Sequence, residues 1–88
     1  MRSPNVSNQF KRDAKKHYAS LITTEWGEVL HCLTNDIELP KKYRDHALTG
    51  NYVGFRDCHV KPDLVLIYRL NGADLDFVRL GTHSELFK

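Results

Sequence analysis

The sequence lacks a long hydrophobic run, and its 88 residues include only two cysteines, Cys32 and Cys58. No apolar stretch approaches the roughly 20 residues that a membrane-spanning helix needs. Residues 1–16 contain no hydrophobic segment of the kind that a secretory signal peptide requires. Two cysteines in a chain without an export signal are typical of reduced core residues, not of a disulfide framework. We therefore expect a cytoplasmic protein with no membrane partner.

The composition supports one small globular domain. Hydrophobic residues make up 41% of the chain and aromatic residues 10%, which is enough for a packed core and excludes a disordered tail. A chain of this length buries only about 60–65% of its unfolded surface, so it supports a single core. We expect one domain over residues 1–88.

The net charge of +2 conceals an alternation along the chain. Residues 1–20 are mainly basic. Residues 21–40 carry acidic side chains and no lysine or arginine, and residues 41–63 are again mainly basic. Aromatic side chains are interspersed in the third segment: Tyr43, Tyr52 and Phe55. Basic and aromatic side chains together are typical of nucleic-acid-binding surfaces. The composition therefore permits an RNA partner without demanding one.

Hydrophobic residues at three- and four-residue steps predict two helices in the first half of the chain. The first extends to residue 22, and either Ser7 or Asn8 can cap it. The second follows directly and continues to about residue 37, before Pro40 ends it. We interpret both apolar stripes as faces that pack on the core.

The second half of the chain has the pattern of strands, predicted over residues 52–60, 64–70 and 75–80. The middle strand is apolar at nearly every position, as expected of a strand covered on both faces. Asn71-Gly72 is predicted to occupy the two central positions of a type I′ hairpin turn. Residues 2–6 can add a short edge strand. The fold class predicted is α+β, with a helical hairpin packed on a twisted antiparallel sheet of three to four strands.

This topology brings side chains capable of proton transfer and phosphate binding to one end of the sheet. The expected set is His59, Asp63, Arg79 and His83. Counting from the predicted turn places Arg79 opposite Leu64, next to Asp63. Such a set suits RNA cleavage, because histidine can transfer protons near neutral pH and arginine binds phosphate oxygens. His46 precedes these strands, and its spacing does not decide whether it joins them.

Other roles fit the same residues. Asp63 can simply cap the turn, and Arg79 can pair with Asp57 or Asp76. Histidine and aspartate are also zinc ligands, but the short ligand-pair spacings of structural zinc sites are absent. We therefore expect no metal and no cofactor.

Four segments of the second half then stand in the order and spacing of one known family. They are DHALTG (45–50), FRDCHVKPD (55–63), LIY (66–68) and RLGTHSELF (79–87). In these segments the chain resembles the YafQ family of bacterial toxins, within the RelE/ParE superfamily. The resemblance is close over residues 43–88 and extends to residues 1–40 only in helical pattern and length. It implies a RelE-like fold and an endoribonuclease that cuts messenger RNA in the ribosomal A site without a metal, leaving a 2′,3′-cyclic phosphate and a 5′-hydroxyl.

The resemblance also implies which residues act. By position, the functional set is His46, His59, Asp63, Arg79, His83 and Phe87. His83 is the expected general acid at the leaving oxygen, while Asp63 and His46 remain alternatives for the general base. His59 would orient or stabilise, Arg79 would hold the phosphate, and Phe87 could stack on a base. Basic residues chosen by position and charge alone would contact ribosomal RNA: Lys11, Lys15, Lys41, Lys42 and Arg44.

The implied partner is a cognate antitoxin, expected to be dimeric, in a complex that can bind operator DNA and that covers or displaces part of the active rim. Some relatives carry an aromatic residue after the Pro-Asp pair, where this chain has Leu64. Two alternatives stay open: a ParE-like poison that binds gyrase without chemistry, and an inactive relative that only binds antitoxin or RNA. The His, Asp and Arg set favours the nuclease, because a binding poison needs no proton-transfer groups.

Overall fold

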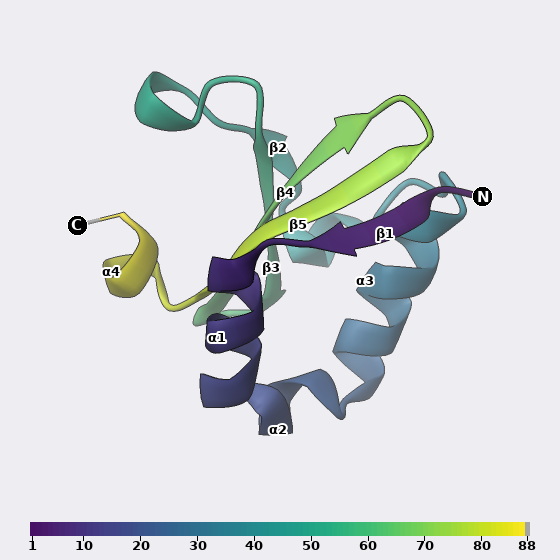
Figure 1. Cartoon of the computed structure of the whole chain (residues 1–88). Coiled ribbons are helices and arrows are strands. Elements are labelled where there is room, and N and C mark those ends of the chain that lie inside the picture. The colour runs from purple at the N-terminus through teal and green to yellow at the C-terminus, as the bar shows by residue number, and fades with distance from the viewer. Residues whose placement is uncertain (88) are drawn as a thin grey trace.

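The computed structural model describes residues 1–87 and combines helices with one mixed β-sheet (Figure 1). The helices are α1 (Asn8–Lys16), α2 (Tyr18–Leu21), α3 (Thr24–Thr34) and α4 (His83–Leu86), with short 3₁₀ helices η1 (Lys41–Tyr43) and η2 (Gly50–Tyr52). The strands are β1 (Ser3–Val6), β2 (His46–Ala47), β3 (Arg56–Lys61), β4 (Leu64–Asn71) and β5 (Asp74–Gly81). The predicted α+β class is confirmed.

The sheet has five strands in the order β1-β5-β4-β3-β2, so the prediction of three to four strands was too low. It is also mixed, because β1 runs parallel to β5 while the other pairs are antiparallel. The edge strand predicted near residues 2–6 is therefore present as β1, where the Ser3 N–H donates to the Ala73 carbonyl at 2.8 Å. β2 was missed because a strand of two residues has no measurable alternation.

The first helix is shorter than predicted. The Ser7 hydroxyl accepts a hydrogen bond from the Phe10 N–H at 2.9 Å and so caps α1, but α1 ends at Lys16 and α2 is a separate single turn. Beyond this break Tyr18 is 65% and Ile22 is 78% exposed, whereas Leu21 packs, partly buried, against the core. Because so little of the stripe is covered there, a longer continuous helix would gain little from packing.

The hairpin register also differs from the prediction. The central turn residues are Gly72 and Ala73, because Asn71 pairs with Asp74, and Gly72 alone of the two has a positive φ, at 63°. A bulge lies between the partners of Ile67 and Tyr68. These two shifts place Arg79 opposite Ile67, so the prediction that it lies opposite Leu64 was wrong. The turn is one residue later than assumed, and the bulge adds a further offset.

The first predicted strand begins later than expected, because residues 50–52 form η2 and β3 starts at Arg56. The intervening residues 48–55 form an arm, closed by a hydrogen bond from the Leu48 N–H to the Phe55 carbonyl at 2.9 Å. This arm is visible as the teal loop beside α4 and away from α1 to α3 (Figure 1). The arm and α4 together build one wall of the candidate site.

Both faces of β4 are buried from Leu64 to Tyr68, as predicted for the middle strand, while its last three residues are exposed. On one face, Leu66 and Tyr68 join a core with α1 and α3 that includes the stacked rings of Phe10 and Phe77, with centroids 5.4 Å apart. On the other face, Val65 and Ile67 pack with Leu86 of α4 and with partly buried residues of the arm. Cys32 and Cys58 are free and buried, in agreement with the prediction. Within residues 1–87, no helix has the length and apolar character needed to cross a membrane.

Candidate active site

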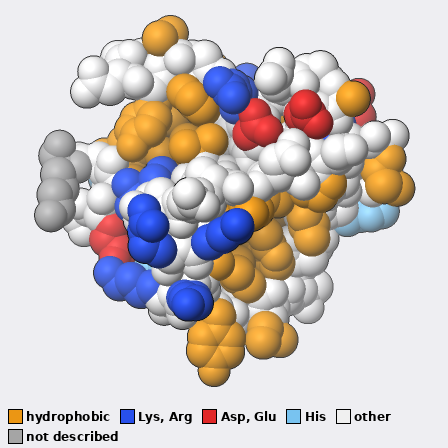
Figure 2. All heavy atoms as spheres, in the orientation of Figure 1, with side chains coloured by type: hydrophobic (Ala, Val, Ile, Leu, Met, Phe, Trp, Pro, Cys, Tyr) orange, Lys and Arg blue, Asp and Glu red, His pale blue; other side chains and the backbone are white. Residues whose placement is uncertain are grey.

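The candidate site lies on the sheet face opposite α1 and α3, between the arm and α4. Hydrophobic side chains are visible in the hollow between these two segments (Figure 2). Sequence analysis did not predict α4, although its signal is present: Thr82 and Glu85 form a capping box. The Glu85 N–H donates to the Thr82 hydroxyl at 3.3 Å, and the Thr82 N–H donates to Glu85 Oε1 at 2.8 Å. This box starts the helix at His83, so it fixes where the histidine enters the site.

Glu85 also attaches α4 to the junction of α1 and α2. Its carboxylate accepts from Lys16 and lies 3.0 Å from His17 Nε2. The hydrogen bond from Lys16, followed by that from the Thr82 N–H, lowers the pKa of Glu85 to about 2. Gly81 makes this close approach feasible, because a Cβ there would lie only 2.8 Å from Glu85 Oε1. Residues distant in sequence thus hold His83 over the sheet.

Aromatic rings line the hollow next to His83. The ring centroids of His83 and Phe87 are 4.8 Å apart, and those of Phe87 and Tyr52 are 5.9 Å apart. Tyr52 in turn meets Phe55 edge-to-face at 6.2 Å. Phe87 and Tyr52 are only partly buried, so their rings can offer faces to a stacking ligand.

Asp57 on β3 is the functional candidate that sequence analysis missed. It is only 4% exposed, and its Oδ1 lies 3.1 Å from His46 Nδ1. Burial raises the pKa of Asp57, while charge on His46, His59 and His83 acts in the opposite direction. His46 is thus in contact with this buried carboxylate, and His59 and His83 lie near enough for their charge to act on it. The sequence did contain a signal for Asp57. Side chains two residues apart on a strand lie on the same face of the sheet, so Asp57 shares a face with His59.

Arg79 is held from the side by α1. Its Nε donates to Asp13 Oδ2 at 2.9 Å, and the Leu80 N–H donates to the same oxygen at 3.0 Å. Burial acts to raise the pKa of Asp13, but the hydrogen bonds from Arg79 and Leu80 outweigh it and lower that pKa. The Asp13 hydrogen bond raises the pKa of Arg79, and Tyr52 of the arm adds to the effect. The suggested pairing of Arg79 with Asp57 or Asp76 was wrong: Asp13 takes it, and Asp76 pairs with Arg69 at 3.0 Å.

Asp63 stands apart from this cluster. It lies exposed in the turn between β3 and β4. Among residues 1–87, no hydrogen bond or ion pair joins its side chain to a histidine or to Arg79. Its expected neighbour Arg79 is shifted away by the hairpin register described above. The structure thus places His46, His83 and Phe87 in contacts at the hollow and His59 on the same face of β3 as Asp57. Arg79 is held by Asp13, and Asp63 makes none of these contacts among residues 1–87.

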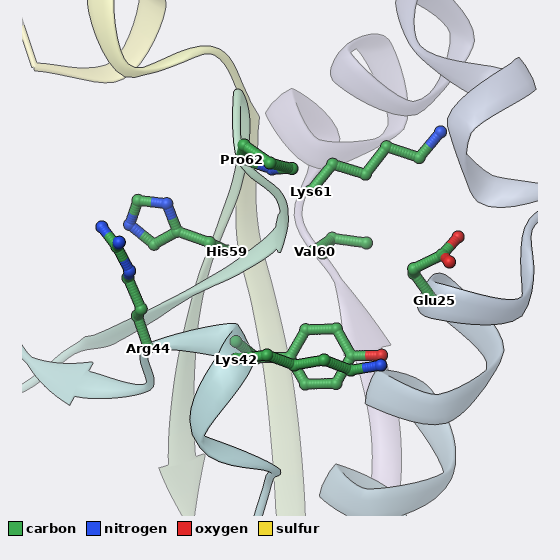
Figure 3. A pocket seen from close by; sticks show the side chains of 8 residues that line it. Glu25, Lys42, Arg44, His59, Val60, Lys61 and Pro62 are labelled. Atoms are coloured by element: carbon green, nitrogen blue, oxygen red, sulfur yellow. The ribbon is translucent and has the colours of Figure 1, made fainter.

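A cleft of about 600 Å³ adjoins the cluster at His59 (Figure 3). Cationic side chains line it from η1, from the residue that follows η1 and from the end of β3, namely Lys42, Arg44 and Lys61, against Glu25 from α3. Arg44 and His59 extend on one side of β3, whereas Val60 and Lys61 extend on the side of α3 (Figure 3). Lys42 also lies 3.6 Å from Glu28. Further lysine and arginine side chains gather over α1, where Lys11 and Lys15 are exposed (Figure 2).

The family described as "Bacterial toxin of type II toxin-antitoxin system, YafQ" matches residues 2–88. The chain belongs to the YafQ family. Its match spans the N-terminal forty residues as well as the second half, which the motifs alone did not establish. The mRNA interferase toxin YafQ of Escherichia coli K12 is 38% identical over 89 residues, covering 98% of this chain and 96% of that protein.

Solved structures agree with this YafQ assignment. The copper-bound L66S mutant toxin from Helicobacter pylori has a TM-score of 0.90 at 36% identity, and the match covers 99% of this chain and all of that chain. YafQ in the Escherichia coli DinJ–YafQ complex has a TM-score of 0.85 at 36% identity, with full coverage of both chains. The YafQ fold therefore extends over the whole described chain, including β1 and α1 to α3.

The copper in the Helicobacter pylori toxin raises the question of a metal in this YafQ-family chain. Within residues 1–87, no three or more His, Cys, Asp or Glu side chains lie together in an arrangement that could hold a metal ion.

Proposed function

We propose that this chain is the toxin of a type II toxin–antitoxin system and cuts messenger RNA by general acid–base catalysis without a metal. The observation that carries the proposal is a hollow lined by Phe87 and Tyr52, with His83 stacked beside Phe87 and His46 in contact with the buried Asp57. Histidine can give and accept protons near neutral pH, and RNA supplies its own nucleophile, the 2′-hydroxyl. The name of the Escherichia coli relative, an mRNA interferase toxin, supports this substrate.

In the proposed reaction, a general base takes the proton of the 2′-hydroxyl, and the 2′-oxygen attacks the adjacent phosphorus. The bond from phosphorus to the 5′-oxygen breaks, and a general acid protonates that oxygen. The products are a 2′,3′-cyclic phosphate and a 5′-hydroxyl. His83 is the proposed acid, because the capping box and Glu85 hold it over the hollow beside Phe87.

The remaining residues have supporting roles in this scheme. Arg79 neutralises charge on the phosphorane, with Asp13 fixing its guanidinium. His59, which lines both the cluster and the cleft, stabilises the same charge. Of the two candidates for the base, what supports His46 over Asp63 is its contact with the buried Asp57. Phe87, with Tyr52, offers a ring on which a base stacks.

The RNA is proposed to lie across the hollow and continue into the cleft, where Lys42, Arg44 and Lys61 meet neighbouring phosphates. The exposed Lys11, Lys15 and Lys41 would contact ribosomal RNA, so that the toxin acts in the ribosomal A site in the cytoplasm. A single domain over residues 1–88 carries all these groups.

An antitoxin partner is supported by the structure of the Escherichia coli DinJ–YafQ complex. We extend this to a dimeric cognate antitoxin that covers part of the hollow and binds operator DNA with the toxin. Both the stoichiometry and the DNA binding belong to the proposal.

The test is cleavage of a defined message on programmed ribosomes in magnesium buffer, by toxin that has been stripped with EDTA and then dialysed free of it, mapped by primer extension. Discrete cuts in the A-site codon by the stripped toxin are the expected result. Loss of all cuts by the stripped toxin, with recovery on adding back a transition metal such as Zn²⁺ or Cu²⁺, would overturn the metal-independent mechanism. If the message stays intact and purified gyrase is inhibited, the chain is a ParE-like poison. If the message stays intact and gyrase is not inhibited, the chain is an inactive relative.

A further inference from the structure

A second pocket, of about 310 Å³, lies on the α1 side of Arg79. Three elements build it, since α4 follows β5 and lies beside α1 (Figure 1). Its walls are Gln9, Arg12, Asp13 and Lys16 of α1, Arg79 of β5 and Glu85 of α4. The four α1 residues stand three or four apart in sequence, so they share one face of the helix. Two ion pairs, Asp13 with Arg79 and Lys16 with Glu85, turn that face toward β5 and α4.

The walls of this pocket carry more positive than negative charge. Three cations, Arg12, Lys16 and Arg79, face two carboxylates, Asp13 and Glu85. The carboxylates are already occupied: Asp13 accepts from Arg79 and from the Leu80 N–H, and Glu85 from Lys16 and the Thr82 N–H. These pairs neutralise two of the cations and leave the charge of Arg12. A net charge of one matches a phosphodiester, which carries a single negative charge.

Arg12 is oriented by its neighbours and keeps most of its donors. Its Nη2 donates to Gln9 Oε1 at 2.9 Å, and Gln9 Nε2 in turn donates to Asp13 Oδ1 at 3.1 Å. Among residues 1–87, no carboxylate forms an ion pair with Arg12. A guanidinium has five N–H donors in a planar fork that matches two phosphate oxygens. The contact with Gln9 therefore fixes the side chain while leaving its remaining donors available to an anion.

Arg79 connects this pocket with the hollow. Its Nε and Nη2 donate to Asp13 at 2.9 and 3.4 Å, on the side of α1. On the other side stands Tyr52 of the arm, which adds to the effect of Asp13 in raising the pKa of Arg79. Tyr52 belongs to the hollow, where its ring contacts Phe87. One guanidinium thus lies between the two sites, so neighbouring phosphates of a single strand can occupy both.

We propose that this pocket is a second phosphate subsite, in which Arg12, beside Arg79 and Lys16, binds the message phosphate next to the one that is cut. The inference rests on the proposed function, which it deepens by giving the substrate a path past Arg79. Arg12 supplies charge-assisted hydrogen bonds, while Asp13 and Glu85 keep the two other cations in place. Phosphate contacts position a strand without reading its bases. The subsite therefore adds affinity and register to cleavage and no base preference.

The first experiment tests the pocket without any cleavage. The whole chain is titrated with inorganic phosphate at constant ionic strength, and NMR follows the side-chain Nε–H signals of Arg12 and Arg79. Both signals should shift together and saturate. Arg12→Gln removes the charge of an exposed side chain and should weaken the binding reported by Arg79 about three- to tenfold. A shift of Arg79 without Arg12 would place the anion in the hollow and overturn the proposal, as would no shift of either.

The second experiment locates the phosphate in the message. Synthetic messages carry a single neutral methylphosphonate, placed in turn at each position near the cut, and are tested on programmed ribosomes. For the wild type, neutralising one phosphate next to the cut should raise KM about three- to tenfold with kcat nearly unchanged. The same message should cause no further loss in Arg12→Gln, because the two changes remove one contact. Arg2→Gln, at a cation that pairs with Asp36 outside the pocket, is the matched control and should keep the wild-type pattern.

The outcomes separate the two hypotheses. If the wild type cuts and no methylphosphonate has an effect that depends on Arg12, the subsite is overturned while the nuclease stands. If the wild type does not cut, the proposed function is overturned and the message with it as the ligand. The phosphate titration then still decides whether the pocket of Arg12 and Arg79 binds phosphate.

Discussion

The face of the sheet that packs on α1 and α3 and the face that carries the hollow use their residues differently. On the first face, a continuous set of buried apolar side chains reaches from Phe10 to Leu80. On the second, Val65, Ile67 and Leu86 form a small fully buried cluster, and ionisable groups stand around it. The helical face therefore supplies most of the hydrophobic stabilisation. The other face holds an uncompensated carboxylate and partly exposed rings, which cost stability but suit chemistry.

This division implies that stability and activity can be disturbed separately. Changes on the helical face should unfold the chain while leaving the rate of each folded molecule intact. Changes on the face of the hollow should abolish turnover with little effect on folding.

The largest expected effect follows from removing the proposed general acid. His83→Ala should lower kcat by about 10²–10⁴-fold, the usual contribution of one proton-transfer group. His83 is exposed at the start of α4, so the free energy of unfolding should change little. Primer extension gives the rate, and denaturant unfolding gives the stability. If the variant cut at the wild-type rate, His83 would not be the acid.

The converse change is Leu75→Ala on the helical face. Leu75 is fully buried, so the variant should lose about 2–5 kcal/mol of unfolding free energy through lost transfer energy and a cavity. The turnover of the folded fraction should remain near that of the wild type. Val53→Ala, at a position 72% exposed, is the control and should shift stability by less than about 0.5 kcal/mol. A proportional loss of turnover per folded molecule would show that the two faces are not independent.

The same contrast explains which features the sequence predicts. The buried positions of the helical face can be predicted from periodicity, because the apolar residues of α3 and β4 recur at regular steps in the local sequence. The end of α1 at Lys16 cannot be predicted in this way, because the apolar stripe continues beyond Lys16 in the sequence. The position of Arg79 depends on a bulge and on a turn displaced by one residue, and neither has a signal in the residues that alternate along the strands.

The hollow depends still more on tertiary structure. Asp57 stands among basic residues and looks like a surface counter-ion in the sequence. Its burial arises only because β2 pairs beside it and three histidines approach from separate elements. The family resemblance supplied His46 and Phe87, which spacing could not place.

An intermediate effect is expected at the contact where the two faces are linked, Asp13 with Arg79. Asp13→Asn should cost about 2 kcal/mol of stability at pH 7, as for a hydrogen bond to a charged group. Because the pKa of Asp13 is lower in the folded chain than its ordinary value of 3.8, the carboxylate stabilises the fold above that value. This contribution is lost as the pH falls through the lower folded pKa.

Unfolding of the wild type and the Asp13→Asn variant at pH 7, 4 and 3 measures this dependence. The difference between them should be full at pH 7 and shrink below about pH 4, since the unfolded carboxyl then binds a proton. A difference that stays constant with pH would mean that the charge of Asp13 does not contribute. Turnover should fall as well, because Arg79 loses its fixed orientation.

The smallest effect is expected in the cleft, where each cation is proposed to make one phosphate contact. Lys61→Ala should raise KM about three- to tenfold at unchanged kcat, and the slope of log affinity against log salt should decrease by about 1. Arg2→Ala is the matched control, because Arg2 pairs with Asp36 and lies outside the cleft, so its loss should leave the slope unchanged. A lower kcat for Lys61→Ala would indicate that the cleft aligns the reacting phosphate. An unaltered slope would place the RNA elsewhere and confine recognition to the aromatic hollow.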